Sequence, residues 1–397
     1  MIAHIDADSF FASVLIRLHP HLKGKPVLAI GMGGSCVIAA SYEAKAKGVK
    51  TGMRLREARM LVPHAIEMAS DFRETGLASR QIESILKDTC PIVEQMSIDE
   101  WFLDLASLVG GLPEDLKEWA TNIRLEILKQ TDLSMSVGVA PTKTLAKMAS
   151  EYRKPAGITV VQKRDIEQFL KDRPAAAISG IGRQRKAKTD AMGWATAWDF
   201  ARASNEALKK ICGCTGIELQ RELLGERVYI VRADIRPPQS ISRCRTFKAT
   251  TERALLKAHL LKHLEYCTMK MRRQSLLCTE ISLHVRTAEY QYIVSHHRFP
   301  QACSTASQMM PAMLSALERI MIKGKRYGQV GLALHGLTPT GSIQQSIFED
   351  VEVSIADERL QAALDRIQTR FGRDSVTRGA ALQVKSGTHK EINLTIV

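Results

Sequence analysis

Short apolar runs alternate with helical patterns over the first 165 residues, and this alternation restricts the possible folds more than any other feature of the sequence. The runs have the length of strands, and the stretches between them are amphipathic. Strands separated by helices predict an α/β or α+β domain. The predicted strands cover residues 1–7, 25–31, 36–41, 134–140 and 157–161, a hairpin or strand pair covers 93–105, and predicted helices cover 42–48, 54–62, 72–90 and 141–154.

The remaining sequence changes character twice. Short helical segments broken by glycine predict a small all-helical domain over residues 166–230. Adjacent prolines at 237 and 238 cannot continue a helix or a central strand, so residues 231–240 are predicted to form a linker. Residues 241–338 predict an α/β sandwich with strands at 242–250, 277–287, 292–300 and 327–337 and helices at 251–273 and 303–323, and the tail 339–397 contains a helical pattern at 357–372.

The formal net charge of +14 is concentrated in one part of the chain. Residues 241–338 contain 15 basic and 5 acidic side chains, so they supply +10 of the total. Such an excess favours a polyanionic partner such as nucleic acid, although a basic surface that serves solubility is the alternative. No window approaches 18 uninterrupted apolar residues, and acids replace the basic start of a signal peptide, so we expect a cytoplasmic protein with no membrane partner. The eight cysteines include no Cys-x-x-Cys pair, which is typical of reduced, mostly buried thiols.

Two acidic clusters lie at the ends of predicted strands. The segment HIDADSFF contains Asp6 and Asp8, and the segment SIDE contains Asp99 and Glu100. Carboxylates beside apolar residues are costly to bury without a partner, and hard oxygen ligands in this number suit Mg²⁺. Two such ions stabilise the attacking and leaving oxygens of a phosphoryl transfer. Taken singly, either cluster could also belong to a turn or a helix N-terminus.

Six ordered blocks of the sequence resemble the Y-family translesion DNA polymerases, the bacterial DinB and UmuC group. The blocks are HIDADSFFASV at 4–14, LKGKPV at 22–27, ASYEAKAKGVKTGM at 40–53, SIDEWFLDL at 97–105, SVGVAPTKTLAKMASEYRKPAG at 136–157 and GIG at 180–182. The resemblance implies an α+β multidomain right-hand polymerase. Its implied parts are a palm (1–11 and 71–165), fingers (12–70), a helix-hairpin-helix thumb (166–230) and an α/β little-finger domain (241–338).

The resemblance also implies the metal site. Asp6, Asp99 and Glu100 match the metal-binding carboxylates of the family, the Ala7 backbone carbonyl is a further ligand, and two Mg²⁺ ions are the implied cofactors. Asp99 and Glu100 are also the implied catalytic residues. Asp8 is not a ligand in the family, whereas strand periodicity would place it on the same face as Asp6. We follow the family.

The nucleotide site follows in the same way. Phe11 occupies the steric-gate position, which implies selection of deoxynucleotides, and we expect Phe10 to be a core residue. Tyr42, Lys45 and Lys154 match the triphosphate-binding positions. The sequence departs from many members at Ala39, where a hydroxyl residue is common, and at Lys45, where arginine is common and would offer a bidentate fork. Lys143 and Lys147 lie four residues apart on a predicted helix, and Lys143 could approach phosphates or simply be solvated.

Two segments are predicted to bind primer-template DNA. In the thumb, Gly180 and Gly182 would let backbone amides approach a phosphate. In the little finger, the basic residues of one strand would track the DNA backbone without reading its sequence. The predicted DNA-binding residues are Gly180, Gly182, Lys186, Arg243, Arg245 and Lys248, with Lys188, Arg272 and Arg273 nearby in the sequence.

The segment QQSIF at 344–348 resembles the bacterial sliding-clamp-binding peptide. Gln344, Ile347 and Phe348 would be its anchors, because an aliphatic-aromatic pair in a polar setting suits a groove on a partner. The same pair could instead dock the tail onto its own protein.

These observations predict an error-prone, template-directed DNA polymerase that acts in translesion synthesis and DNA damage repair. It would add deoxynucleotides (dNTPs) to a primer 3′-hydroxyl by two-metal phosphoryl transfer, as a monomer. The alternative is a non-catalytic accessory protein on the same fold that binds DNA and the clamp. A palm-type nucleotide cyclase is a third possibility, but it would need neither the thumb nor the basic domain.

Overall fold

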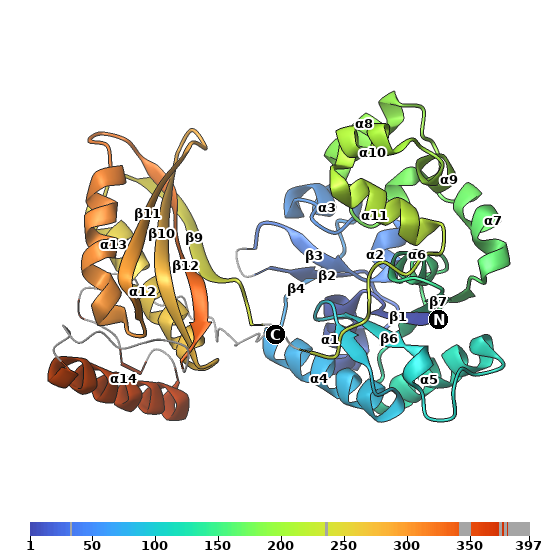
Figure 1. Ribbon diagram of the computed structural model, residues 1–397, viewed down its shortest axis with the longest axis horizontal. Helices are drawn as coiled ribbons and strands as arrows, with labels where there is room; N and C mark the ends of the chain where they lie inside the picture. Colours follow the sequence, from blue (N-terminus) through green and yellow to red (C-terminus); the bar gives the residue numbers. More distant parts are fainter. Residues whose placement is uncertain (32–33, 235–236, 341–350, 373–374, 377–378, 380–397) are drawn as a thin grey trace. The chain divides into compact units, whose positions relative to one another are not determined.

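The computed structural model describes residues 1–31, 34–234, 237–340, 351–372, 375–376 and 379. They divide at residues 235–236 into two compact units, the first N-terminal and the second C-terminal to that point. Figure 1 shows helices and sheets in both units, which confirms the predicted α+β multidomain class. No helix in the described part of the chain has the length and apolar character needed to span a membrane.

A five-stranded sheet forms the centre of the first unit, in the order β5-β6-β1-β7-β8. Strand β1 lies in the middle, antiparallel to both β6 and β7, and β8 is parallel to β7. The strands predicted at 1–7, 134–140 and 157–161 and the strand pair predicted at 93–105 are all present in this sheet. Their bounds are β1 Ile2–Ala7, β5 Val93–Gln95, β6 Glu100–Asp104, β7 Met135–Ala140 and β8 Ile158–Val160.

Helices cover both faces of this sheet. Odd-numbered residues of β1, such as Ile5, pack with α4 (Phe72–Thr89) and α5 (Leu116–Thr131), whereas Ile2 belongs to the core that contains α6 (Lys143–Ser150). Helix α6 lies directly on β7. Glycine at position 138 permits this close approach, since a Cβ there would come within 2.2 Å of the Ala146 carbonyl oxygen. The even-numbered side chains of β1 therefore point toward α6.

A smaller sheet, in the order β3-β2-β4, lies within residues 12–70 of the same unit. Its two predicted strands and its two predicted helices are present. The third strand pairs in parallel with β2 and was not predicted. The elements are α1 Phe10–Leu18, β2 Val27–Ile30, β3 Val37–Ala40, α2 Tyr42–Ala46, α3 Leu55–Leu61 and β4 Ile66–Ala69.

The segment after β8 is helical, as the sequence predicts. A buried carboxylate ties it to the central sheet: Glu222 is 0% exposed and accepts hydrogen bonds from the backbone amides of Thr144, Val228 and Tyr229. The contact to Thr144 fixes the first turn of α6 to this segment. The helices are α7 Ile166–Lys171, α8 Arg183–Ala191, α9 Ala197–Ala201, α10 Asn205–Cys212 and α11 Cys214–Leu223.

The second unit is a four-stranded antiparallel sheet, in the order β11-β10-β12-β9, with two helices packed on one face. All four predicted strands and both predicted helices are confirmed. The strands are β9 Ser240–Thr250, β10 Leu276–Thr287, β11 Tyr292–Cys303 and β12 Tyr327–Pro339, and the helices are α12 Arg253–Arg272 and α13 Ala306–Ile320.

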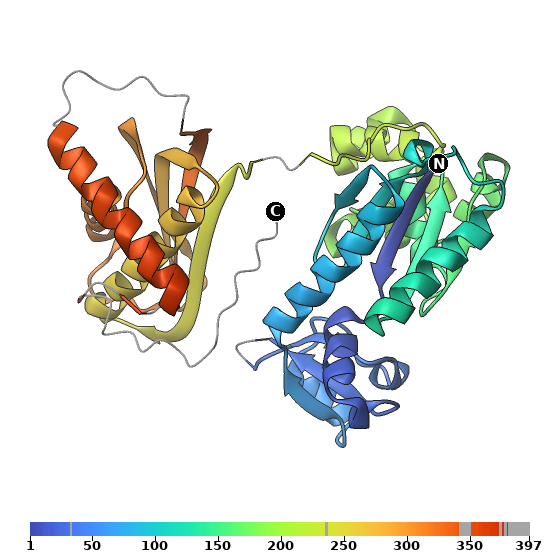
Figure 2. The same cartoon turned by 90° about the horizontal axis from the view of Figure 1, so that it is seen from below.

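A further helix, α14 (Val351–Phe371), lies along the outside of the second unit (Figure 2). Asp357 accepts hydrogen bonds from the hydroxyls of Thr305 and Ser307 at the start of α13. Asp365 forms a two-pronged ion pair with Arg272 at the end of α12, with N···O distances of 2.7 and 2.8 Å. The segment predicted as a tail therefore contributes a helix to this unit.

Candidate active site

The site is built at the C-terminal end of β1, in the middle of the five-stranded sheet. Asp6 is 4% exposed, and the strand register places it opposite Glu100 on β6 and Ser136 on β7. Its position on β1 directs its side chain to the face covered by α6. The sheet therefore brings together two acids that are 94 residues apart in the sequence.

A third carboxylate completes this cluster. One carboxylate oxygen each from Asp6, Glu100 and Glu151 all lie within 4.8 Å of one another. Glu151 directly follows α6 and was missed by the sequence analysis, because only the packing of α6 on the sheet brings it near β1. Its position nine residues after Thr142, the N-terminal cap of α6, could not by itself have indicated this contact.

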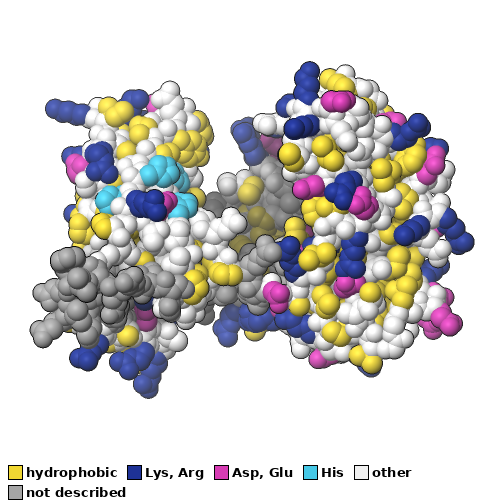
Figure 3. All heavy atoms as spheres, in the orientation of Figure 1, with side chains coloured by type: hydrophobic (Ala, Val, Ile, Leu, Met, Phe, Trp, Pro, Cys, Tyr) yellow, Lys and Arg dark blue, Asp and Glu magenta, His cyan; other side chains and the backbone are white. Residues whose placement is uncertain are grey.

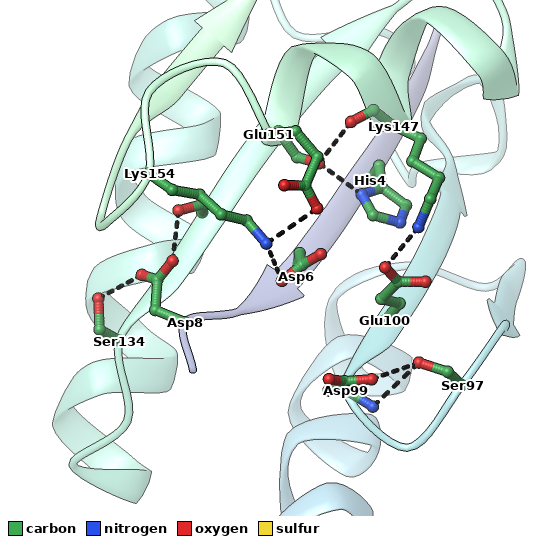
Figure 4. A network of polar contacts seen from close by, with 12 residues as sticks. His4, Asp6, Asp8, Ser97, Asp99, Glu100, Ser134, Lys147, Glu151 and Lys154 are labelled. Carbon is green, nitrogen blue, oxygen red and sulfur yellow. Dashed lines mark hydrogen bonds and ion pairs between the residues drawn. The ribbon is translucent and has the colours of Figure 1, made fainter. Parts of the chain in front are cut away.

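Two lysines neutralise the carboxylate cluster (Figure 4). The Lys154 ammonium lies 2.5 Å from Asp6 Oδ1 and 3.0 Å from Glu151 Oε1. Lys147 pairs with Glu100. Lys154, which is predicted to bind triphosphate, thus pairs with one predicted acid, Asp6, and with one newly found acid, Glu151.

Burial makes these charges sensitive to their surroundings. Burial raises the pKa of Asp6 to about 8, although the nearby Lys154 ammonium opposes the shift. Burial lowers the pKa of Lys154, but Asp6 and Glu151 outweigh it, so the net pKa of Lys154 is raised. Three converging carboxylates of this kind fit a hard divalent cation, which would stabilise their ionised forms as the lysines do.

Asp99 lies beside this cluster but is not a member of it. Its carboxylate accepts a hydrogen bond of 2.5 Å from the Ser97 hydroxyl, and burial raises its pKa. The Asp99 backbone carbonyl accepts a hydrogen bond of 2.9 Å from the amide of Ala7, the last residue of β1. The structure therefore places the backbones of Asp99 and Ala7 together, while the Asp99 side chain points to Ser97.

Asp8 does not continue the face of Asp6. Strand β1 ends at Ala7, so the two-residue periodicity no longer applies at Asp8. Asp8 is 2% exposed, and its carboxylate accepts hydrogen bonds from the Ser134 and Ser136 hydroxyls, each at 2.7 Å, and from the Ala156 amide at 2.8 Å. The spacing argument for a shared face is wrong here, because the chain turns before Asp8.

Tyr42 and Lys45 lie together on α2. The Tyr42 hydroxyl donates to Asp8 Oδ1 at 3.3 Å, and the Lys45 ammonium lies 4.6 Å from the centre of the Tyr42 ring. Burial raises the pKa of Tyr42, and burial together with Lys154 lowers the pKa of Lys45. The three residues predicted to bind triphosphate thus lie around one region, next to the carboxylate cluster.

The two phenylalanines after β1 have different environments. Phe10 is 2% exposed and belongs to the core, which confirms its expected packing role. Phe11 is partly exposed, and its ring packs edge-to-face on Phe72 at 5.5 Å between centres. Ser9 precedes them with φ of 49°, a left-handed conformation that turns the chain from β1 into α1. This turn presents Phe11 close to the end of the strand that carries Asp6.

Lys143 does not reach this cluster. Its ammonium pairs with Glu94 at 2.7 Å and lies 4.5 Å from the centre of the Phe102 ring. Its side chain is 13% exposed, so Lys143 is not the solvated lysine that one alternative expected.

The predicted thumb hairpin has the backbone geometry of a tight turn. Gly180 has φ of +100°, which favours glycine, and Gly182 caps the N-terminus of α8. Arg185 closes the turn by donating to the Gly180 carbonyl oxygen at 2.8 Å. Lys186 is exposed on α8 and pairs with Asp190.

The basic residues of the second unit are only partly where the sequence analysis expects them. Arg243, Arg245 and Lys248 lie on edge strand β9, but the Arg243 guanidinium packs over the Tyr266 ring of α12. Arg272 pairs with Asp365 of α14, and its side chain is 17% exposed. Arg273 lies beside it and donates to Thr369 of α14.

The other face of this sheet carries residues that the sequence analysis did not select. Figure 3 shows histidine side chains gathered on the second unit. The pairing of β10 with its neighbours places alternate residues of adjacent strands side by side on the face without α12 and α13. This face includes His284, Arg286, Tyr292, His296, Arg298 and His335. The strict alternation in β10 and β11 was the signal that could have identified them.

Gln344, Ile347 and Phe348, the predicted clamp-binding anchors, lie outside the residues that the structure describes.

A mixed sheet that presents clustered carboxylates, a following helical segment and a separate α/β unit together define a multidomain polymerase fold. Solved structures with this fold include a Y-family DNA polymerase chimera of Dbh and Dpo4, with a TM-score of 0.76 and 24% identity over 85% of this chain and 99% of that one. DinB from Sulfolobus solfataricus matches with a TM-score of 0.57 and 25% identity, covering 84% of this chain and 98% of that one.

The sequence comparisons identify the family. Residues 5–151 match the impB/mucB/samB family, and residues 238–347 match the C-terminal domain of the same family. Protein SamB of Salmonella typhimurium is 30% identical over 92% of this chain and 90% of its own length. DNA polymerase IV of Xanthomonas axonopodis pv. citri is 32% identical over 87% of this chain and 97% of its own length. The chain belongs to the impB/mucB/samB family, the UmuC and DinB group of Y-family polymerases that the sequence motifs indicate.

Proposed function

We propose that this protein is a DNA-directed DNA polymerase that acts in translesion synthesis. The observation that carries the proposal is the group of buried carboxylates around Asp6, placed next to Lys154, Tyr42 and Lys45. A cation site beside a cationic phosphate site is the arrangement that nucleotidyl transfer needs. Relatives named DNA polymerase IV, similar over nearly their whole length, support the same activity.

Asp6, Asp99 and Glu100 are the proposed ligands of two Mg²⁺ ions, with the Ala7 carbonyl as a further ligand. When bound, the ions would activate the primer 3′-hydroxyl and stabilise the charge that develops on the α-phosphate and the leaving pyrophosphate. Asp99 and Glu100 are the proposed catalytic residues. Glu151 adds negative charge to the same site through its position near Asp6.

Lys154, Lys45 and Tyr42 are proposed to bind the triphosphate of the incoming dNTP. Ammonium groups and a phenol offer donors to phosphate oxygens, and Lys154 already connects this region with Asp6. Phe11 is the proposed steric gate. Its partly exposed ring, backed by Phe72, is suited to contact a sugar and to exclude a 2′-hydroxyl.

The remaining segments are proposed to hold primer-template DNA. The assignment is a palm (1–11 and 71–165), fingers (12–70), a thumb (166–230) and a little finger (241–338). In the thumb, Gly180, Gly182 and Lys186 would contact a phosphate. In the little finger, Arg243, Arg245 and Lys248 would contact the DNA backbone without reading its sequence. The arginines and histidines of the helix-free face are separate candidates for such contacts, because Arg243 and Arg245 lie opposite the core residues Leu332 and Val330.

We also propose that the protein works as a monomer and binds a sliding clamp through Gln344, Ile347 and Phe348. Clamp binding is supported by the sequence motif at 344–348 alone. Replacement of Phe348 by alanine should abolish stimulation by the clamp while primer extension without the clamp stays the same.

Primer extension tests the main proposal. The native protein should extend a labelled primer on an undamaged and an abasic-site template, with Mg²⁺ and all four dNTPs. The double variant Asp99→Ala/Glu100→Ala should bind the same DNA but not extend it. Glu94→Gln is a matched control, because Glu94 is a carboxylate of the same sheet that pairs with Lys143 outside the cluster. Extension by the double variant would refute the assigned metal site, and no extension by any of the proteins would favour a non-catalytic role.

A further inference from the structure

Asp8 is a buried acid that the proposed chemistry leaves without a role. The structure gives its carboxylate four hydrogen-bond donors, two on each oxygen. Oδ1 accepts from Ser136 and Tyr42, and Oδ2 accepts from Ser134 and the Ala156 amide. A carboxylate engaged in this way has little capacity left for a metal ion.

Two of these donors belong to segments that carry triphosphate-binding candidates. The Ala156 amide lies two residues after Lys154, and the Tyr42 hydroxyl is itself a candidate. The other two donors, Ser134 and Ser136, belong to β7 or directly precede it, so they fix Asp8 to the central sheet. Asp8 therefore connects the central sheet to two parts of the proposed phosphate site, Tyr42 on α2 and the turn that follows Lys154.

The turn after Lys154 needs such a support. Ala156 has φ of +57°, a left-handed conformation that is unfavourable for a residue other than glycine. The turn is also tight, because a Cβ at Gly157 would lie 1.9 Å from the Arg153 carbonyl oxygen. The hydrogen bond from the Ala156 amide to Asp8 stabilises this strained turn, and so it also fixes the backbone position from which the Lys154 side chain extends.

We propose that Asp8 is a positioning residue of the nucleotide site, which holds Tyr42 and the Lys154 turn in the places where they meet the triphosphate. The inference rests on the proposed function, because it assumes that Tyr42 and Lys154 contact phosphate. Asp8 itself touches neither substrate nor metal. The contact with Tyr42, at 3.3 Å, is the longest of the four, which leaves the hydroxyl free to turn its proton toward a phosphate oxygen.

Asp8→Asn and Asp8→Ala separate positioning from metal binding. The Ala156 amide can only donate, so the carboxamide oxygen of Asp8→Asn must face it, and the carboxamide NH₂ then faces two hydroxyls that can accept. Asp8→Asn should therefore weaken dNTP binding by only about two- to threefold. Asp8→Ala leaves the turn and Tyr42 unsupported, so it should weaken dNTP binding by about tenfold or more.

The measurement is the equilibrium dissociation constant of a dNTP for the protein bound to dideoxy-terminated primer-template DNA, where no turnover occurs. KM, kcat, the Mg²⁺ midpoint and the affinity for DNA are measured beside it. We expect KM to follow the dNTP dissociation constant, with the Mg²⁺ midpoint and the DNA affinity unchanged. Ser134→Ala is the matched control, because it removes one bond to Asp8 but keeps the bonds from Ser136, Tyr42 and Ala156 and the backbone bond from the Asp8 amide to the Ser134 carbonyl oxygen. It should lower the melting temperature slightly and leave dNTP binding unchanged.

The possible outcomes are distinct. Loss of extension in Asp8→Asn as complete as in Asp6→Asn, or a shifted Mg²⁺ midpoint, would make Asp8 a metal ligand and overturn the inference. Unchanged dNTP binding in a folded Asp8→Ala, or equal weakening in Ser134→Ala, would reduce Asp8 to a structural residue. If Asp8→Ala does not fold, Asp8→Asn decides: weakening within the stated range supports positioning, and no change contradicts it. Failure of the native protein itself to bind a dNTP and extend a primer would instead refute the proposed function.

Discussion

The carboxylates around Asp6 in the first unit and the histidines of α12 in the second are buried in opposite ways. Around Asp6 in the first unit, buried carboxylates are compensated by the ammonium groups of Lys154 and Lys147. In the second unit, the histidines of α12 are kept neutral. The ring of His259 stacks on Phe247 at 4.9 Å, and His263, which is 3% exposed, has no hydrogen-bond partner for either nitrogen among the described residues.

The physical cause of this difference is the cost of removing a charge from water. A buried charge is retained only when an opposite charge or a set of donors compensates it; otherwise the group becomes neutral. Burial lowers the pKa of His259 to about 4 and that of His263 to about 3, and nearby arginines act in the same direction. The carboxylates and ammonium groups around Asp6 can bind ions and substrate, whereas the neutral imidazole rings of His259 and His263 contribute through packing.

The largest effect should follow from removing a charge in the first unit. Asp6→Asn should reduce primer extension by about 1,000-fold or more, because about 4 kcal/mol of cation-mediated stabilisation would be lost. The melting temperature should change little, because Lys154 keeps its ion pair with Glu151 and the carboxamide oxygen can still accept a hydrogen bond from the Lys154 ammonium. Extension assays and thermal unfolding measure the two effects, and activity within tenfold of the native level would contradict the assignment.

Acid should destabilise the second unit through the histidines of α12. Their folded pKa values lie below the unfolded value of 6.5, so their contribution is complete above pH 6.5 and is lost as the pH falls toward 3. For His263 alone, the loss between pH 7 and pH 5 is about 2 kcal/mol. The charged or titratable neighbours are Arg243 and Arg245, with Lys262 and His284, and all of them disfavour protonation of one or both rings.

Hydrogen exchange of peptides from α12, measured from pH 7 to pH 5, can follow this loss in the intact protein. All four tryptophans lie before residue 200, so their fluorescence reports on the first unit separately. His263→Leu should flatten the pH dependence of exchange in α12. An equally steep dependence in that variant would show that other groups cause the acid effect.

A partly buried ion pair should have an intermediate effect. Asp365→Ala leaves Arg272 without its two-pronged partner at a position that is 17% exposed. We expect a local loss of about 2 kcal/mol, between the values for exposed and fully buried pairs. Exchange in residues 351–371 should accelerate while primer extension without a clamp is retained, and unchanged exchange would mean that α14 is held by other contacts.

The smallest effect should come from an exposed ion pair. Arg59 and Glu67 form a fork with N···O distances of 2.6 and 2.8 Å, but the Arg59 side chain is 59% exposed. Glu67→Gln should change the melting temperature by less than about 2 °C, because solvent screens such pairs. A larger shift would show that geometry can outweigh exposure in this protein.

Strands and helices with a clear apolar period could be predicted from the sequence. All strands of the second unit belong to this class, because their alternating residues face either the helices or the open side. Strand β4 was missed because its four residues gain their partner only through parallel pairing with β2. Helix α5 was missed although Asp115 caps it, so the signal was present and was not used.

The residues of the candidate site also fall into those that the sequence predicts and those that depend on tertiary packing. Asp6 and Glu100 could be found because each lies in a recognisable motif at a strand end. Glu151 joins them only when α6 packs against β1, and no spacing in the sequence encodes that contact. Asp8 illustrates the opposite error, since the periodicity of β1 stops one residue before it.

The connection between the units has a further consequence for how DNA would be held. The Arg232 amide is tied to Glu94 in the first unit, and β9 of the second unit begins at Ser240. The seven residues between them can span at most about 25 Å. A tether this short gives the second unit an effective concentration on the order of millimolar near any DNA that the first unit binds. Two contacts that are individually weak would then act as one strong contact, and they could still release DNA one after the other.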